Sequence, residues 1–177
     1  MKKILAFSGS NNPESINKQL LISTINKIPK MNVHHIQLTD YNIPIYNPEI
    51  EKKGIPKSIR EIFQLFTEAD GFIIASPEHN GLPSSFFKNI IDWLSRIDQK
   101  FFGDKPVLLM STSPGATGGA SHLQILIKLL PRWGGNLSAH YSLGSFNDNF
   151  DRSNLSITDP IEDLKLNEAI QALIQSK

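Results

Sequence analysis

Cysteine is absent from the 177 residues of the chain. This absence excludes disulfide bonds, thiolate-bound zinc, iron–sulfur clusters and a cysteine nucleophile. A cysteine-free chain is compatible with a reducing compartment, although many exported bacterial proteins also lack cysteine. We therefore expect a cytoplasmic protein that carries out its chemistry without thiols.

An excess of charge and long apolar runs are absent as well. The 18 Lys and Arg residues nearly balance 17 Asp and Glu, which leaves a net charge of +1. Such a chain has no overall field to attract nucleic acid or a membrane surface. The apolar N-terminal stretch Ile4–Phe7 ends at Ser8, and no later run is long enough to cross a bilayer. We expect a soluble protein that binds neither nucleic acid nor membranes.

The residues that are present indicate an ordinary globular protein, 40% hydrophobic and 20% charged. The length predicts one domain over residues 1–177. Short apolar segments bounded by Gly, Pro, Ser or Asn predict five buried strands, at Ile4–Ser8, Val33–Leu38, Gly71–Ser76, Pro106–Ser111 and Leu137–Leu143. Apolar residues at helical spacing predict a helix after each strand.

This alternation predicts an α/β fold, a flavodoxin-like three-layer sandwich. Its five-stranded parallel sheet has the order 2-1-3-4-5, with helices on both faces. In such sheets a ligand binds at the carboxyl ends of the strands where the order reverses, here between the first and third strands. The loops that follow the first, third and fourth strands are therefore the candidate site.

The first of these loops, residues 8–17, is rich in serine and asparagine. Its hydroxyls and the free amides of the next helix can converge on a phosphate. It lacks both the Gly-Lys-Ser/Thr of a P-loop and the dinucleotide motif GxGxxG. A capped β–α turn without a ligand would have the same composition, so both interpretations stay open at this point.

The second loop contains Ser76-Pro77-Glu78-His79-Asn80-Gly81, and the third, residues 111–120, contains three glycines. The Pro and Gly of the second loop predict a stiff backbone that can bind the edge of a planar heterocycle, with His79 against its face. Acid–base catalysis by Glu78 is disfavoured because no second carboxylate accompanies it. The glycines of the third loop permit close approach of a flat ligand, or form a flexible connection.

Taken together, the three loops resemble the NADPH-dependent FMN reductase family, flavodoxin-like flavoenzymes that include quinone, azo-dye and chromate reductases. The resemblance covers nearly the whole chain and is most specific from Ser76 to Trp93. It implies an oxidoreductase that passes hydride from NADPH or NADH to FMN, and then electrons to a small acceptor. Quinones, azo compounds, free flavins and metal oxyanions are the acceptors it implies. It also implies a homodimer, with a tetramer as the alternative.

The resemblance assigns cofactor contacts to all three loops. The FMN phosphate would lie against Ser8, Ser10, Asn12, Ser15, Ile16 and Asn17. The isoalloxazine ring would be bordered by Pro77, Glu78, His79, Asn80 and Gly81, and on its other side by Ser113, Gly115 and Gly118. No metal and no catalytic side chain are expected, because the flavin carries the chemistry.

Three positions depart from the family pattern. Asn12 stands where the phosphate loop usually has Arg, so one cation is missing from the cradle. His79 replaces a usual Tyr, and Ala120-Ser121-His122 follow the glycine pair where Arg is common. These departures keep open the alternative of a flavodoxin-type electron carrier, or an FMN-binding protein without its own NAD(P)H activity. The near-zero net charge argues against the carrier.

Overall fold

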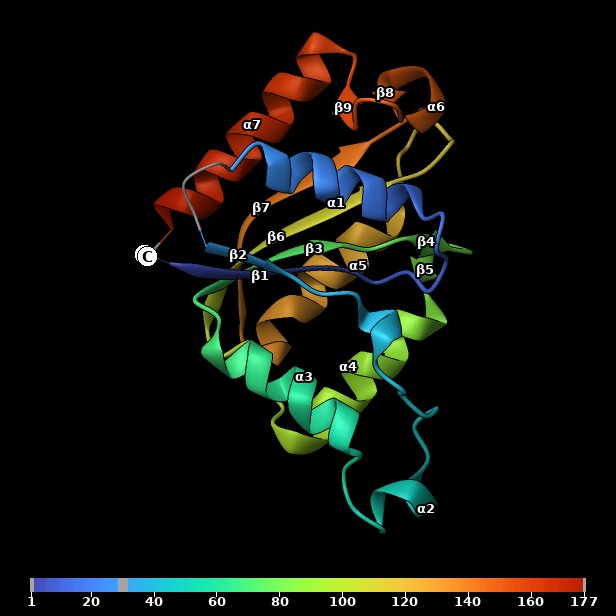
Figure 1. The fold of residues 1–177 in the computed structure, drawn as a ribbon, viewed down its shortest axis with the longest axis vertical. Coiled ribbons are helices and arrows are strands. Elements are labelled where there is room, and N and C mark those ends of the chain that lie inside the picture. Colours follow the sequence, from blue (N-terminus) through green and yellow to red (C-terminus); the bar gives the residue numbers. More distant parts are fainter. Residues whose placement is uncertain (1, 29–31, 177) are drawn as a thin grey trace.

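The computed structural model describes residues 2–28 and 32–176 and is built around a five-stranded parallel sheet (Figure 1). The strands are β1 (Lys3–Ser8), β2 (Asn32–His35), β3 (Gly71–Ala75), β6 (Lys105–Thr112) and β7 (Gly135–Leu143). Their order in the sheet is β2-β1-β3-β6-β7, and each neighbouring pair is parallel. The predicted flavodoxin-like order 2-1-3-4-5 is therefore confirmed.

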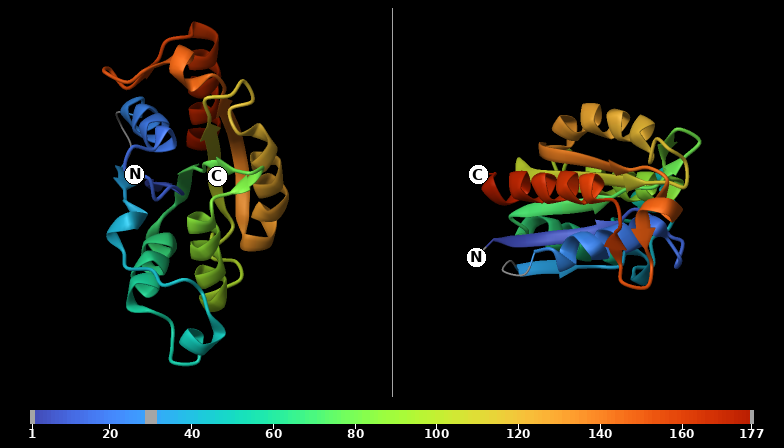
Figure 2. Two further views of the ribbon diagram at one scale, coloured as in Figure 1. Left: turned by 90° about the vertical axis from the view of Figure 1, so that its right-hand side faces the viewer. Right: turned by 90° about the horizontal axis from the view of Figure 1, so that it is seen from above.

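Helices cover the sheet on both faces, in the three layers seen from two further sides in Figure 2. On one face lie α1 (Ile16–Asn26) and α7 (Pro160–Gln175), and on the other α3 (Lys57–Glu68), α4 (Ser85–Ile97) and α5 (Ala120–Leu129). Successive strand residues point to opposite faces, so each strand contributes to two separate apolar cores. In β1, Ile4 joins the core under α1 and α7, and Leu5 joins the core under α3, α4 and α5.

Polar side chains fix where the helices nearest the site begin. Ser15 precedes α1 and accepts a hydrogen bond from Lys18 N at 3.4 Å. Ser84 precedes α4 and accepts from Phe87 N at 3.0 Å. Each cap satisfies one of the amides that a helix leaves free in its first turn. The first residues of α1, Ile16 and Asn17, directly follow the loop after β1.

Several short elements lie in segments that were predicted as loops. Residues 76–85 form a hairpin of β4 (Glu78–His79) and β5 (Leu82–Pro83). The segment 36–56 contains η1 (Leu38–Asp40) and α2 (Pro48–Glu51), so the second strand ends at His35 and not at Leu38. After β7 follow α6 (Phe146–Asn149), β8 (Phe150–Asp151) and β9 (Ser156–Ile157), and η2 (Leu130–Trp133) extends α5. Elements this short are not revealed by hydrophobic periodicity.

The long segment before α3 is anchored to α4 by Trp93 and Asn89. Pro44 O accepts hydrogen bonds from Trp93 Nε1 at 2.8 Å and from Asn89 Nδ2 at 3.0 Å. The Tyr46 ring lies edge-on to Trp93, with 5.1 Å between ring centroids. Trp93 is fully buried in these contacts. Its role is to hold this segment against the helix.

No helix in the described part of the chain combines the length and apolarity needed to cross a membrane.

Candidate functional site

The loops after β1, β3 and β6 lie side by side at the carboxyl edge of the sheet, on the right in Figure 1. Backbone hydrogen bonds continue from the strands into the loops, from Gly9 N to Ala75 O at 2.9 Å and from Ser76 N to Met110 O at 2.8 Å. Ser84 Oγ also donates to Gly9 O at 2.5 Å. The three loops singled out in the sequence therefore form one continuous surface.

The first loop is braced by its own polar groups. Ser10 Oγ accepts from Asn12 N at 3.2 Å, and Asn12 Oδ1 accepts from Glu14 N at 3.0 Å. Ser8 is different, because its side chain is 8% exposed and its Oγ has no hydrogen-bond partner among the described residues. A buried hydroxyl without a partner is costly, so this atom marks a place where a polar ligand fits.

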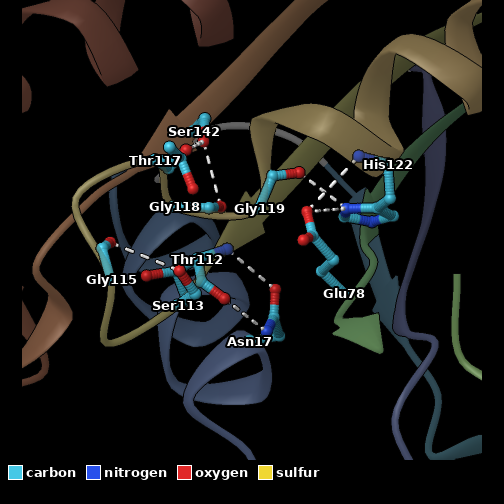
Figure 3. A network of polar contacts seen from close by, with 10 residues as sticks. All are labelled: Asn17, Glu78, Thr112, Ser113, Gly115, Thr117, Gly118, Gly119, His122 and Ser142. Carbon is cyan, nitrogen blue, oxygen red and sulfur yellow. Dashed lines mark hydrogen bonds and ion pairs between the residues drawn. The ribbon is translucent and has the colours of Figure 1, made fainter. Parts of the chain in front are cut away.

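Asn17 connects this loop to the end of β6, as Figure 3 shows. Its Nδ2 donates to Thr112 O and its Oδ1 accepts from Thr112 N, both at 3.0 Å. The side chain is buried and its amide is occupied on both sides by backbone groups. Asn17 thus has a structural role that the sequence did not reveal. The backbone N–H of Asn17 and the second hydrogen of its Nδ2 are still available to donate to a phosphate, as predicted.

The second loop is the hairpin β4–β5, whose turn is Asn80-Gly81. Both turn residues have positive φ, +52° and +76°, which is the geometry of a tight hairpin turn and suits an Asn-Gly pair. Pro77 is buried, whereas His79 and Asn80 are exposed at the tip. The hairpin therefore presents a rigid backbone at the edge of the site.

Glu78 reaches away from the hairpin tip towards α5, where it meets His122 (Figure 3). Glu78 Oε2 accepts from His122 N at 3.3 Å and lies 3.5 Å from His122 Nδ1. The imidazole is fully buried, and Nδ1 lies 2.6 Å from Gly119 O. Burial lowers the pKa of His122, although the Gly119 carbonyl and the Glu78 carboxylate oppose this shift. A neutral ring that donates from Nδ1 to Gly119 follows from this arrangement.

The glycines of the third loop differ in what they approach. A Cβ on Gly118 would lie 2.5 Å from the carbonyl carbon and oxygen of Leu143, and one on Gly119 would lie 2.3 Å from Ser111 Oγ. These two are buried and packed against their own chain. Gly115 is exposed, and its Cβ would meet only Ser113 Oγ, at 3.7 Å. The exposed part of this loop therefore runs from Pro114 to Thr117, with the half-buried Ser113 before it.

Two cavities adjoin these loops. One, of about 170 Å³, lies between the first loop and residues 35–39 and is lined by Ser8, Ser10, Asn12, Lys18 and Gln37 among others. The other, of about 580 Å³, is a mostly apolar groove between the hairpin, α4 and α5. Within the described ranges, no group of three or more His, Asp or Glu side chains could hold a metal ion.

Sequence reasoning missed three participants in this site. Thr112 could not be paired with Asn17, because the contact joins residues that are far apart in the chain. His122 was noted only as a departure from the family pattern, and its contact with Glu78 depends on how α5 packs. Lys18 did carry a signal, since a cation in the first turn of a helix is unfavourable without an anion nearby.

The sheet order and the helices on both faces define a class, the flavodoxin-like α/β proteins. The sequence profile of NADPH-dependent FMN reductases matches residues 2–148. The chain belongs to this family of oxidoreductases, for which FMN and NADPH are the expected cofactors.

Individual relatives agree with this assignment. The chain is 38% identical to a quinone reductase of Escherichia coli over 93 residues, half of each protein. It is 33% identical to an NAD(P)H-dependent FMN reductase of Pseudomonas aeruginosa over 119 residues, which cover 67% of this chain and 63% of that protein. An uncharacterized protein of Mycoplasma pneumoniae is 28% identical over 80% of this chain and 87% of its own length.

The fold is also that of solved flavoenzymes. The flavoenzyme NAD(P)H:(acceptor) oxidoreductase FerB from Paracoccus denitrificans superposes with a TM-score of 0.77 over 99% of this chain and 98% of that one. An apo NADH:FMN oxidoreductase superposes with a TM-score of 0.68 over 100% and 91%. Their identities of 21% and 20% establish the common fold alone.

Proposed function

We propose that the protein, acting as one domain over residues 1–177, is an FMN-dependent NAD(P)H oxidoreductase that reduces a small-molecule acceptor in the cytoplasm. The observation that carries this proposal is the meeting of three loops at the point where the strand order reverses, with the buried Ser8 Oγ left without a partner. Quinones, azo compounds, free flavins and metal oxyanions are the acceptor classes we propose.

The first loop would hold the FMN phosphate. Hydroxyls of Ser8, Ser10 and Ser15 can each donate to a phosphate oxygen. The backbone amides of Ile16 and Asn17 lie in the first turn of α1, where no intrahelical acceptor is available. Asn12 lines the 170 Å³ cavity together with Ser8 and Ser10. These donors suit an anion, and none of them carries a charge.

The isoalloxazine ring would lie between the hairpin and the third loop. Pro77, Glu78, His79, Asn80 and Gly81 would border it through their backbone groups, and Ser113, Gly115 and Gly118 would lie on its other side. Bound FMN supplies hydride acceptance from the nicotinamide and electron donation to the acceptor. The contribution of the chain is to hold both partners in contact, and the rigid turn at Asn80-Gly81 serves this positioning.

We also propose that the protein works as a homodimer, with a tetramer as the alternative assembly. The support from the structure is the apolar groove beside the hairpin, which is lined by Leu82, Ile91, Ile125, Leu129 and Trp133 among others. Leu82 is 55% exposed, an unusual position for a large apolar side chain at the tip of a hairpin. A second copy seated there would cover the groove next to the flavin ring.

Anaerobic reduction tests the proposed function. The purified protein is loaded with FMN, and its visible spectrum is recorded before and after addition of NADPH or NADH. Loss of the flavin absorbance within seconds is the expected result. A protein that binds FMN but is not reduced by either nucleotide would match the carrier alternative. A protein that takes up no FMN would refute the site as a whole.

A further inference from the structure

The small cavity beside the first loop contains an ammonium group as well as hydroxyls. Lys18, in the first turn of α1, lines it together with Ser8, Ser10 and Asn12 from the loop, and Gln37 from the segment after β2. Its volume of about 170 Å³ is below the roughly 300–1,000 Å³ of pockets that enclose a whole small ligand. The cavity therefore suits one charged group of a larger ligand.

Among the described residues, Lys18 has no anionic partner in this cavity. Its Nζ donates to Gln37 Oε1 at 2.6 Å, which is a neutral acceptor and uses one of three N–H groups. The ion pairs formed within residues 2–28 and 32–176 involve other cations. The first turn of α1 contains no acidic residue, so no carboxylate within that turn offsets the positive end of the helix dipole. Both features favour a bound anion.

Two further residues, Ser8 and His35, line the cavity beside Lys18. Ser8 lines the cavity with a buried hydroxyl that has no partner in the described part of the chain. His35 lines it from the end of β2, and its pKa is lowered by burial, by the charge of Lys18 and by His34. His35 is therefore neutral near pH 7 and leaves Lys18 as the cationic group on the cavity wall.

We propose that Lys18 supplies the positive charge that binds the phosphate of FMN, in place of the arginine that the loop lacks at Asn12. The ammonium would approach the phosphate from the first turn of α1, while Ser8 Oγ donates to it from the end of β1. This inference rests on the proposed function, because it concerns how this chain holds that cofactor. The family pattern places the cation in the loop after β1, whereas this proposal places it on α1.

Comparing FMN with riboflavin isolates the phosphate contact, since riboflavin has the same ring system and no phosphate. Dissociation constants of both flavins are measured by fluorescence quenching for the native protein, K18Q and the control K128Q. Lys128 is an exposed lysine of α5 on the opposite face of the sheet. We expect K18Q to weaken FMN binding about tenfold or more, as for loss of one charge-assisted hydrogen bond. Riboflavin binding stays unchanged, and K128Q changes neither.

A rescue variant and a second readout complete the test. The double variant K18Q/N12R returns a cation to the loop and should recover most of the FMN affinity without changing riboflavin binding. Independently of any flavin, inorganic phosphate added to the native protein should raise the pKa of His35 in an NMR titration. A bound anion offsets the charge of Lys18, and the rise is absent in K18Q.

The possible failures separate the two proposals. Equal effects of K18Q on FMN and riboflavin, or no effect on either, would overturn the role of Lys18 and leave the proposed function standing. A native protein that binds neither flavin would overturn the proposed function. In that event the His35 titration still decides whether Lys18 forms an anion site, and an unchanged pKa overturns it.

Discussion

The buried side chain of Asn17 joins α1 to the end of β6. Its buried amide pairs both backbone groups of Thr112, and truncation would leave a buried N–H and a buried C=O without partners. Because each of these two groups costs roughly 1–3 kcal/mol, we expect Asn17→Ala to lower the free energy of unfolding by about 2–6 kcal/mol. Urea denaturation measures this. Asn11→Ala, in the exposed part of the same loop, is the matched control, and an equal loss there would contradict the assignment.

His122 makes stability depend on pH. Its pKa is lowered in the folded protein, so the unfolded chain binds more protons once the pH falls below the ordinary histidine value of about 6.5. The contribution of this group is therefore fully present above pH 6.5 and is lost progressively on acidification. His35, whose pKa is also lowered, acts in the same direction.

We expect His122→Gln to reduce the loss of stability between pH 7 and pH 5. Urea midpoints of the native protein and the variant are measured at pH 7 and pH 5. The quantity to compare is the change in midpoint of each protein between the two pH values. A Gln side chain retains a donor for Gly119 O but does not titrate. A native protein and variant with the same pH dependence would show that the pKa of His122 does not differ between the folded and the unfolded chain.

At the scale of elements, the third loop depends on Gly118 for its packing. A Cβ at Gly118 strains a φ of +60° and overlaps the backbone of Leu143. The strained φ costs about 1–2 kcal/mol and the overlap a further 1–3 kcal/mol or so. Gly118→Ala should therefore destabilise the protein clearly more than Gly81→Ala, which has a φ of +76° but nothing within 4 Å. Thermal unfolding of the two variants measures the difference, and equal losses would exclude the close packing.

The elements differ in how far the sequence predicts them. The central strands β1, β3 and β6 follow from their apolar runs, because nearly all of their residues are buried. The helices α3 and α4 follow from hydrophobic periodicity, because each buries one apolar face. The hairpin β4–β5 does not, since two residues per strand define no period, although Asn80-Gly81 is a turn signal in its own right. The site shows the same limit. Its three loops follow from strand topology, whereas the contacts of Asn17 with Thr112 and Lys18 with Gln37 depend on packing between distant segments.

At the scale of the whole molecule, the exposed apolar groove predicts association. Leu82→Asp places a charge in the groove that we expect a second copy to cover, so the variant should be monomeric in light scattering at concentrations where the native protein is dimeric. Ile45→Asp is the control, because Ile45 is 83% exposed on the segment before α2, away from the groove. If the native protein is monomeric, the proposed interface does not exist. If only Ile45→Asp dissociates the dimer, the interface lies away from the groove.

Because of the hydrogen bonds between Asn17 and Thr112, hydrogen exchange of one backbone amide, the N–H of Thr112, reports on local opening. The N–H of Thr112 is protected by a side chain of α1, so it exchanges with solvent only when α1 and the end of β6 separate. Its exchange rate in deuterated buffer thus measures how often α1 separates from β6 beneath the proposed cofactor site. Because a phosphate bound in the first turn would hold α1 in place, loading with FMN should slow this one amide more than amides in the middle of β6.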